Sequence, residues 1–291
     1  MKRYSTIAII TIIFSACASN QNKAIEHFER AQKLYKEDKI KDASIEIDSA
    51  INLDKSNLDF QITKAKIIAK TDNYELAISI LQEVLNQNFK VDTVNYYLGD
   101  SYFGYGSYFS KKQKVKESAT GSFEKAVYYY NEAINNNAQY FEAYVAKSRA
   151  FHNQSKSDEA LVVLNTAINL FPDSISLLYN RGVEKIYIGD LAGAMIDLNG
   201  SIQSNSLDSI NQATAYRFRG LLHQKNNDLD SAILDLTNAL HYNPKDEYAL
   251  YNRADCYKEK GLKEKACNDY RRAADLGFVN LYATIKEYCG N

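Results

Sequence analysis

The chain has 291 residues, with 35 Lys and Arg against 36 Asp and Glu, and a formal net charge of −1 at pH 7. This near-neutral balance argues against nucleic acid as the main partner, because phosphate binding needs an excess of basic side chains. The hydrophobic share, 45%, is ordinary for a folded protein.

The first 17 residues have the features of a targeting segment. Two basic residues precede an apolar run, 4–14, which is too short to span a bilayer and is followed by small residues. The sequence Phe-Ser-Ala-Cys at 14–17 resembles the lipobox of bacterial lipoproteins, with Phe14 where leucine is usual. The resemblance implies cleavage before Cys17 and its acylation, with chains such as palmitate as a membrane anchor, and 18–23 as a polar tether. Ordinary secretion is the alternative.

The residues after Cys17 bear on where the anchor points. The resemblance implies outer-membrane targeting when a non-acidic residue such as Ala18 follows the lipidated cysteine. No acidic run follows in 19–22, which disfavours export to the cell surface. We expect a lipid-anchored protein on the periplasmic face of the outer membrane, and surface orientation stays open.

An alanine recurs at a fixed period through the rest of the chain. Successive spacings are 34, 49, 34, 34, 38 and 34 residues, so a period of 34 carries insertions of 15 and 4. A second column of small residues precedes the first by 12 positions in six repeats, while Gly99 of the third repeat is displaced by the longer insertion. Because only a small residue lets antiparallel helices approach closely, both columns indicate helix contacts. The first column is Ala43, Ala77, Ala126, Ala160, Ala194, Ala232 and Ala266; the second is Ala31, Ala65, Ser148, Gly182, Gly220 and Ala254.

These columns resemble the tetratricopeptide repeat. The only two prolines, Pro172 and Pro244, fall where the second helix of a repeat ends, and proline cannot continue a helix. The resemblance implies an all-α fold, a right-handed superhelical solenoid of about seven helix pairs over 24–280, closed by a capping helix over 281–291. The repeats are 24–57, 58–91, 92–140, 141–174, 175–208, 213–246 and 247–280.

The third repeat contains the longer insertion, 104–122, between its two helices. Its glycines, lysines and aromatic residues predict an irregular segment. It is either a flap whose lysines meet an acidic partner or anionic lipid, or a solvent loop of the kind that repeats tolerate.

Three cysteines remain near the C-terminus. An oxidising compartment permits disulfides. Cys267 follows the packing alanine of the last repeat, and Cys289 lies on the apolar side of the closing helix. A Cys267–Cys289 bridge would hold that helix on the last repeat; three buried thiols are the alternative. Cys256 replaces a small packing residue and is expected to be inert.

Catalytic and metal-binding patterns give no support for an enzyme. The four histidines are scattered without zinc-ligand spacing. No nucleophile motif and no glycine-rich phosphate loop occurs. We therefore expect no enzyme activity, no metal and no cofactor.

The repeat resemblance implies a binding surface on the first helices, at repeat positions 2, 5, 6, 9, 12 and 13. Tyr and Arg are the side chains that most often carry interface energy, and Asn can satisfy a peptide backbone. Lys66 and Asp100 also fall at such positions. The candidate groove residues are Tyr96, Tyr97, Arg149, Tyr179, Asn180, Arg217, Phe218, Tyr248, Tyr251 and Asn252.

The expected function is a membrane-anchored scaffold that binds a peptide or helix of an envelope protein in this groove. A carbohydrate-binding lipoprotein with a Tyr-lined groove is one alternative. A structural homo-oligomer, whose groove is filled by another copy, is the other. The identity of the partner is not predicted.

Overall fold

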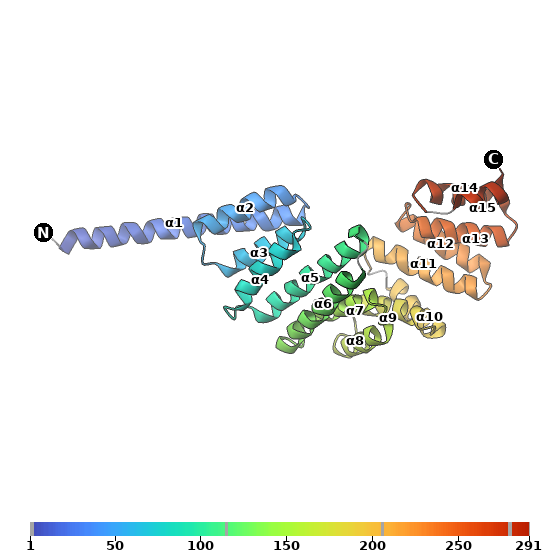
Figure 1. Cartoon of the computed structure of the whole chain (residues 1–291), viewed down its shortest axis with the longest axis horizontal. Coiled ribbons are helices and arrows are strands. Elements are labelled where there is room, and N and C mark those ends of the chain that lie inside the picture. The colour runs from blue at the N-terminus through green and yellow to red at the C-terminus, as the bar shows by residue number, and fades with distance from the viewer. Residues whose placement is uncertain (1–2, 114–115, 205–206, 279–280, 291) are drawn as a thin grey trace. The chain divides into compact units, whose positions relative to one another are not determined.

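The computed structural model describes residues 3–113, 116–204, 207–278 and 281–290. These residues form helices and no strands, so the all-α prediction is confirmed. The chain divides into two compact units, 1–155 and 156–291. Figure 1 shows the helices as successive antiparallel pairs within each unit.

The first unit holds three helix pairs, α1/α2, α3/α4 and α5/α6, followed by α7, and each helix contacts the next along the chain. The pairs α1/α2 and α3/α4 match the first two expected repeats. The bounds are α1 Arg3–Lys36, α2 Ile40–Leu53, α3 Leu58–Ala69, α4 Tyr74–Leu85, α5 Val91–Tyr108, a π-helical turn Phe109–Gln113, α6 Lys116–Asn136 and α7 Phe141–Asn153.

The second unit begins with α8 and continues with the pairs α9/α10, α11/α12 and α13/α14, after which a short helix and a π-helical turn close the chain. The bounds are α8 Ser157–Leu170, α9 Ile175–Tyr187, α10 Leu191–Gln203, α11 Ser209–Lys225, α12 Leu229–Tyr242, α13 Glu247–Glu259, α14 Lys263–Asp275, α15 Leu281–Thr284 and the π-helical turn Ile285–Cys289.

Helix α1 begins well before the first repeat. It includes the backbone of 18–23, so the segment predicted as a tether is helical and continuous with the first repeat helix. The side chain of Cys17 lies outside the described part of the structure. Lipidation and leader cleavage therefore stay predictions. Within the described residues, no helix combines the length and hydropathy that a membrane crossing requires.

Both columns of small residues lie in the core, as predicted. Every alanine of the first column is 0% exposed. At Gly99 an added Cβ would lie 2.5 Å from Cε1 of Tyr130, and at Gly220 it would lie 3.0 Å from Cγ of Leu236. Since such contacts leave no room for a side chain, the small residues set how closely the paired helices approach.

The turn inside most repeats has a left-handed residue at one fixed position. Glycine adopts the left-handed backbone conformation without steric cost, and Asn and Asp adopt it more readily than other residues that have a side chain. The conformation reverses the chain in a short turn after the first helix. The residues are Asp38 (φ 58°), Asp72 (61°), Ser155 (59°), Gly189 (86°), Asn227 (59°) and Gly261 (74°).

The insertion 104–122 is helical in its described part, so the expectation of an irregular loop or flap is wrong. Helix α5 runs on to Tyr108, the π-helical turn follows, and α6 begins at Lys116. Gly104 does not break the helix; it makes room for the Tyr74 ring, with which an added Cβ would clash. The Tyr105 hydroxyl also donates to the Glu75 carboxylate. The extra residues thus lengthen the third hairpin. Their end of α5 packs against Tyr74 and Glu75 of α4. Residues 114 and 115 lie outside the described residues.

A series of basic residues, here called the basic ladder, precedes the second column of small residues by one position. In the second unit each arginine donates two hydrogen bonds to an aspartate 16 residues later, at 2.7 to 3.0 Å. These aspartate side chains are only 2 to 4% exposed, so each needs its arginine as a partner. The pairs are Arg181–Asp197, Arg219–Asp235 and Arg253–Asp269.

The basic ladder also links successive hairpins. The Nη1 atoms of the three arginines donate to Asn165, Asn199 and Thr237, each on the preceding second helix. In the first unit Lys64 reaches back to Asp48 at 2.8 Å and Lys147 to Asn131 at 2.8 Å. The ladder therefore joins the two helices of each hairpin α9/α10, α11/α12 and α13/α14, and in both units it links hairpins to the preceding second helix.

The closing segment packs on α14 and buries Leu281, which is 3% exposed, in the core of the last hairpins. Cys267 on α14 and Cys289 form a disulfide, with Cα atoms 5.6 Å apart. Cys256 is a buried free thiol whose pKa is raised to about 12 by burial. Such a thiol is poorly ionised at neutral pH and is chemically inert.

We predict that Cys289→Ser lowers the free energy of unfolding of the second unit by about 3 kcal/mol, because the bridge closes a loop between residues 22 apart in sequence. Urea unfolding under non-reducing conditions measures this difference. Wild-type protein that is unfolded, reduced and refolded should behave like the variant, whereas the same treatment should leave the variant unchanged. Equal stability of oxidised and reduced wild type would contradict the prediction.

A second prediction concerns Asp197. Burial alone would raise its pKa, but hydrogen bonds from Arg181 and Lys185 outweigh burial and hold the pKa below its usual value. A folded pKa below the unfolded one stabilises the fold at neutral pH, and this contribution is lost as the pH falls below about 4.

The urea midpoint of Asp197→Asn should therefore start lower at pH 7 and fall less steeply than that of wild type between pH 5 and about pH 3. Asp173→Asn, at an exposed position, is the matched control and should follow wild type. Parallel pH curves for wild type and Asp197→Asn would rule this account out.

Candidate functional site

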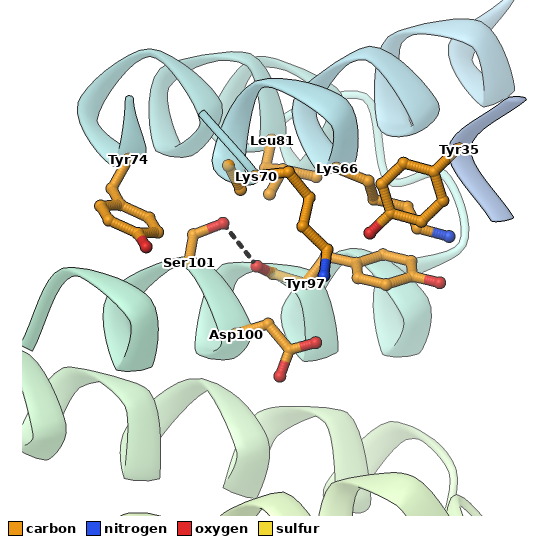
Figure 2. Close-up of a pocket in the computed structure, with 9 residues that line it drawn as sticks. Tyr35, Lys66, Lys70, Tyr74, Leu81, Tyr97, Asp100 and Ser101 are labelled. Carbon is orange, nitrogen blue, oxygen red and sulfur yellow. Dashed lines mark hydrogen bonds between the residues drawn. The ribbon is translucent and has the colours of Figure 1, made fainter. Parts of the chain in front are cut away.

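The inner face of the first unit contains a cleft of about 180 Å³ between the first helices of three successive hairpins. Side chains from α1, α3 and α5 form its walls together with Leu81 and Tyr74 of α4, and Tyr74 lies at the left end of the view in Figure 2. The cleft is lined by Tyr35, Lys66, Ala69, Lys70, Tyr74, Leu81, Tyr97, Asp100 and Ser101.

Lys66 of α3 and Lys70, which follows the last residue of α3, lie against tyrosine rings in this cleft. The Lys66 ammonium is 4.5 Å from the ring centre of Tyr97 and 5.7 Å from that of Tyr35, and Lys70 is 6.0 Å from Tyr35. Each ring attracts a cation held over its face. The two ammonium groups are thus positioned in the cleft by aromatic contacts.

Asp100 is the carboxylate among the lining residues, and it is engaged on the other side of α5. It accepts a hydrogen bond from Tyr130 of α6 at 2.8 Å, and Figure 2 shows it directed away from Lys66 and Lys70. Burial raises the pKa of Asp100, and the hydrogen bond from Tyr130 and the charge of Arg149 oppose that rise. The carboxylate therefore takes part in the packing between α5 and α6, and it also lies in the field of Lys66.

The last repeat contains the same arrangement. Tyr270 of α14 donates to Asp255 of α13, and Tyr251 lies beside Tyr270 with ring centres 6.1 Å apart. Asp255 and Tyr270 occupy the repeat positions that Asp100 and Tyr130 hold in the third repeat. A buried Tyr–Asp pair is therefore part of the internal structure of two repeats.

A second cleft of about 220 Å³ shares Tyr35 and Lys66 with the first. Its other lining residues are Gln32, Lys36 and Thr63. The two clefts together form what we call the inner groove, the surface of α1, α3 and α5 lined by both sets of residues. It exposes three lysines and several aromatic rings.

The predicted residues of the first unit have different surroundings. Tyr97 lines the inner groove. Tyr96 packs among other tyrosines, with ring centres 5.2 Å from Tyr97 and 5.0 Å from Tyr140. Arg149 lies over the ring of Phe103 at 4.6 Å. Of these three, only Tyr97 is among the residues lining the cleft.

The predicted residues of the second unit are engaged within the fold. Tyr179 packs against the core of α9, α10 and α11, and the Asn180 amide donates to the Ser176 carbonyl at 2.8 Å. Tyr251 stacks on Phe278 with ring centres 4.7 Å apart, while Asn252 is half-buried. Substituting Tyr179 or Tyr251 would therefore disturb packing as well as any binding surface.

Arg217, Phe218 and Tyr248 form one cluster in the second unit. Arg217 pairs with Asp246 at 3.2 Å, and its guanidinium lies 4.8 Å from the Phe218 ring centre and 5.6 Å from that of Tyr248. Tyr248 is 53% exposed, and its ring meets that of Phe278 edge-on at 5.3 Å. A role of these residues in partner binding stays a prediction.

Several groove residues were missing from the predicted set, among them Tyr35, Lys70, Tyr74 and Ser101. Tyr35 and Lys70 stand at repeat positions 12 and 13, which the inner-face rule includes, so the rule could have found them. Tyr74 comes from a second helix and Ser101 from repeat position 10, which no inner-face rule covers. In the described ranges, no group of three or more His, Cys, Asp or Glu side chains is arranged to hold a metal ion.

Comparison with solved structures establishes the fold. A tetratricopeptide repeat protein from Parabacteroides merdae has a TM-score of 0.62 at 16% identity, over 92% of this chain and 97% of its own. Yeast Tom70 has a TM-score of 0.58 at 17% identity, over 89% of this chain and 51% of its own. PilW, a widely conserved type IV pilus biogenesis factor, has a TM-score of 0.54 at 15% identity, over 67% of this chain and 87% of its own.

Sequence comparison leads to the same family. A TPR repeat-containing protein of Methanocaldococcus jannaschii is 22% identical over 312 residues, which cover 93% of this chain. The alignment takes in 55% of that relative, so the chain spans about half its length. Residues 219–277 match the family model described as tetratricopeptide repeat. With its buried small-residue columns and stacked helix pairs, the chain has the fold of the tetratricopeptide repeat proteins, and residues 219–277 match their family model.

Proposed function

We propose that this protein is a protein-interaction scaffold that holds a segment of a partner protein in the inner groove of its first unit. The observation that carries the proposal is the cleft between α1, α3 and α5, lined by tyrosines and lysines from three successive first helices. Aromatic and cationic side chains on a concave surface are the usual anchors of a protein partner.

The size of the clefts favours a protein segment over a sugar. Pockets for small-molecule ligands usually enclose about 300–1,000 Å³, whereas the two clefts measure about 180 and 220 Å³. Each is better suited to a single side chain. A segment that passes along the groove can place successive side chains in both.

The cellular setting of the proposal comes from the sequence. The lipobox-like residues 14–17 support an anchor at Cys17 and a position in the bacterial cell envelope, on the periplasmic face of the outer membrane. Among proteins of the same fold, PilW is a type IV pilus biogenesis factor. An adaptor in envelope assembly, secretion or pilus biogenesis fits a lipid-anchored protein with such a groove.

The test fills the cleft without removing a buried side chain. Ala69 lines the cleft between Lys66 and Lys70, and Ala69→Gln adds bulk there with a good helix former. We expect the envelope proteins retained by affinity-purified wild type, after cross-linking in cells and solubilisation, to drop at least tenfold with Ala69→Gln.

Ala192→Gln is the matched control, because Ala192 is exposed on α10 of the second unit; it should retain the same proteins as wild type. Both variants should keep the wild-type circular dichroism spectrum and melting temperature. A set of retained proteins that is identical for Ala69→Gln and wild type would exclude the inner groove as the binding surface.

A further inference from the structure

A cavity of about 470 Å³ lies at the insertion of the third hairpin, away from the inner groove. Helix α6 has 21 residues, eight more than α7, which packs against it and has 13. Because a short turn joins the end of α6 to the start of α7, the extra residues extend α6 past the far end of α7 by about 12 Å, at 1.5 Å per residue. The cavity occupies the step that this difference in length leaves.

The cavity has two sides, both within the first unit. One side comes from the insertion, through the π-helical turn and the start of α6, and the other from the end of α7 and the turn that follows it. The lining residues of the insertion are Ser110, Ala119, Thr120 and Phe123, and those of the second side are Asn153, Gln154 and Ser155.

The apolar part of the lining belongs to the core of the third hairpin. Ala119 is 5% and Phe123 is 4% exposed. The Phe123 ring lies against that of Phe103, with ring centres 5.4 Å apart. Gly106 makes room for it, since an added Cβ would lie 2.9 Å from Cε1 of Phe123. Packing between α5 and α6 therefore fixes this part of the cavity wall.

Two side-chain amides on the opposite side are held by α7. The Asn153 amide nitrogen donates to the Arg149 carbonyl at 2.9 Å, and that of Gln154 donates to the Ala150 carbonyl at 3.2 Å. Within the described residues, Oε1 of Gln154 is buried and has no hydrogen-bond partner. A buried acceptor without a donor is destabilising, and a ligand hydroxyl in the cavity can supply the donor.

The lining also restricts the chemistry of a ligand. Among the described lining residues, no side chain is ionisable, so a charged ligand would lose hydration without gaining a counter-charge. Serine, threonine and amide side chains both donate and accept hydrogen bonds. The volume falls in the range of about 300–1,000 Å³ that is usual for small-molecule sites. These features favour a neutral ligand with many hydroxyl groups.

We propose that this cavity is a second binding site of the protein and that it takes a neutral sugar unit. Hydroxyls of the sugar bind the amides of Asn153 and Gln154 and the hydroxyls of Ser110 and Ser155, and its C–H groups face the apolar side at Phe123. The cavity shares no lining residue with the inner groove, so the two proposals stand independently.

Saturation-transfer NMR with the full chain, in a detergent without a sugar head group, tests this site. The probes are glucose, galactose, mannose and N-acetylglucosamine, with glucuronic acid and glucosamine as charged analogues. We expect saturation of at least one neutral sugar and at least tenfold weaker binding of the charged analogues, because the cavity offers no counter-charge. Titration gives the dissociation constants.

Asn153→Trp fills the cavity from an exposed position at the end of α7 and should weaken the sugar at least tenfold. Asn226→Trp, at an exposed position after α11 in the second unit, is the matched control and should bind as wild type does. Both variants should keep the wild-type circular dichroism spectrum and melting temperature.

Gln154→Met keeps the length of the side chain and removes its amide. It should weaken the sugar about fivefold, which corresponds to one lost hydrogen bond between neutral groups. A purely structural role of Gln154 would instead change the melting temperature and leave the dissociation constant as it is in wild type.

Three results would overturn the inference: no saturation of any neutral sugar, charged analogues that bind as tightly as the neutral ones, or unchanged sugar binding in Asn153→Trp and Gln154→Met. The Ala69→Gln variant should bind the sugar as wild type does. Failure of the sugar site and failure of the inner groove are therefore distinguishable.

Discussion

The close approach of paired helices at the two small-residue columns is the constraint on which the rest of the structure depends. The alanines there are fully buried, and an added Cβ at Gly220 would meet Leu236 at 3.0 Å. Overpacking at such a contact costs about 1–3 kcal/mol. Each small residue also fixes the rotation of its helix, so its two chain neighbours face in defined directions.

The two chain neighbours of each small residue have different roles. The residue before the small one belongs to the basic ladder, as Lys64 does before Ala65. The residue after it turns to the inner face, as Lys66 does. Successive residues on a helix are about 100° apart, so one packing contact places structural charges on one side and groove charges on the other. A shift of one residue at the column would instead bring one of the two neighbours, Lys64 or Lys66 beside Ala65, into the helix contact.

The basic ladder in the second unit adds directional bonds to this packing. A paired guanidinium and carboxylate accept only a narrow range of geometries, and the aspartates are nearly inaccessible to water. A helix that turned about its axis would leave such a carboxylate without a partner in the interior, which is costly. The ladder therefore opposes rotation of one helix against the next.

Sequence periodicity predicted the structural features that recur in successive hairpins. The columns and the closing segment depend on small or apolar residues at fixed spacing, and that spacing is visible in the chain. Contacts that occur once could not be predicted in this way. Glycines in the insertion suggested a broken helix, whereas Gly104 makes room for the distant Tyr74 ring.

The residues of the inner groove were likewise predictable where they depend on the repeat and not where they depend on contacts that occur once. The position rule selected Tyr97 and Lys66, and both line the inner groove. It also selected Tyr251, which the ring of Phe278 covers. Phe278 lies beyond the last full helix pair, and no rule based on the repeat alone includes it. Whether an inner-face position is open depends on neighbours specific to one hairpin.

The closing segment has a consequence for assembly. In a stack of hairpins the terminal face resembles every internal one, and an identical molecule could add there head to tail and continue without limit. Here Leu281 and the segment bonded through Cys289 occupy that face. An identical hairpin that stacked on α14 would therefore have to displace this segment, which the disulfide holds in place for as long as the two sulfur atoms stay joined.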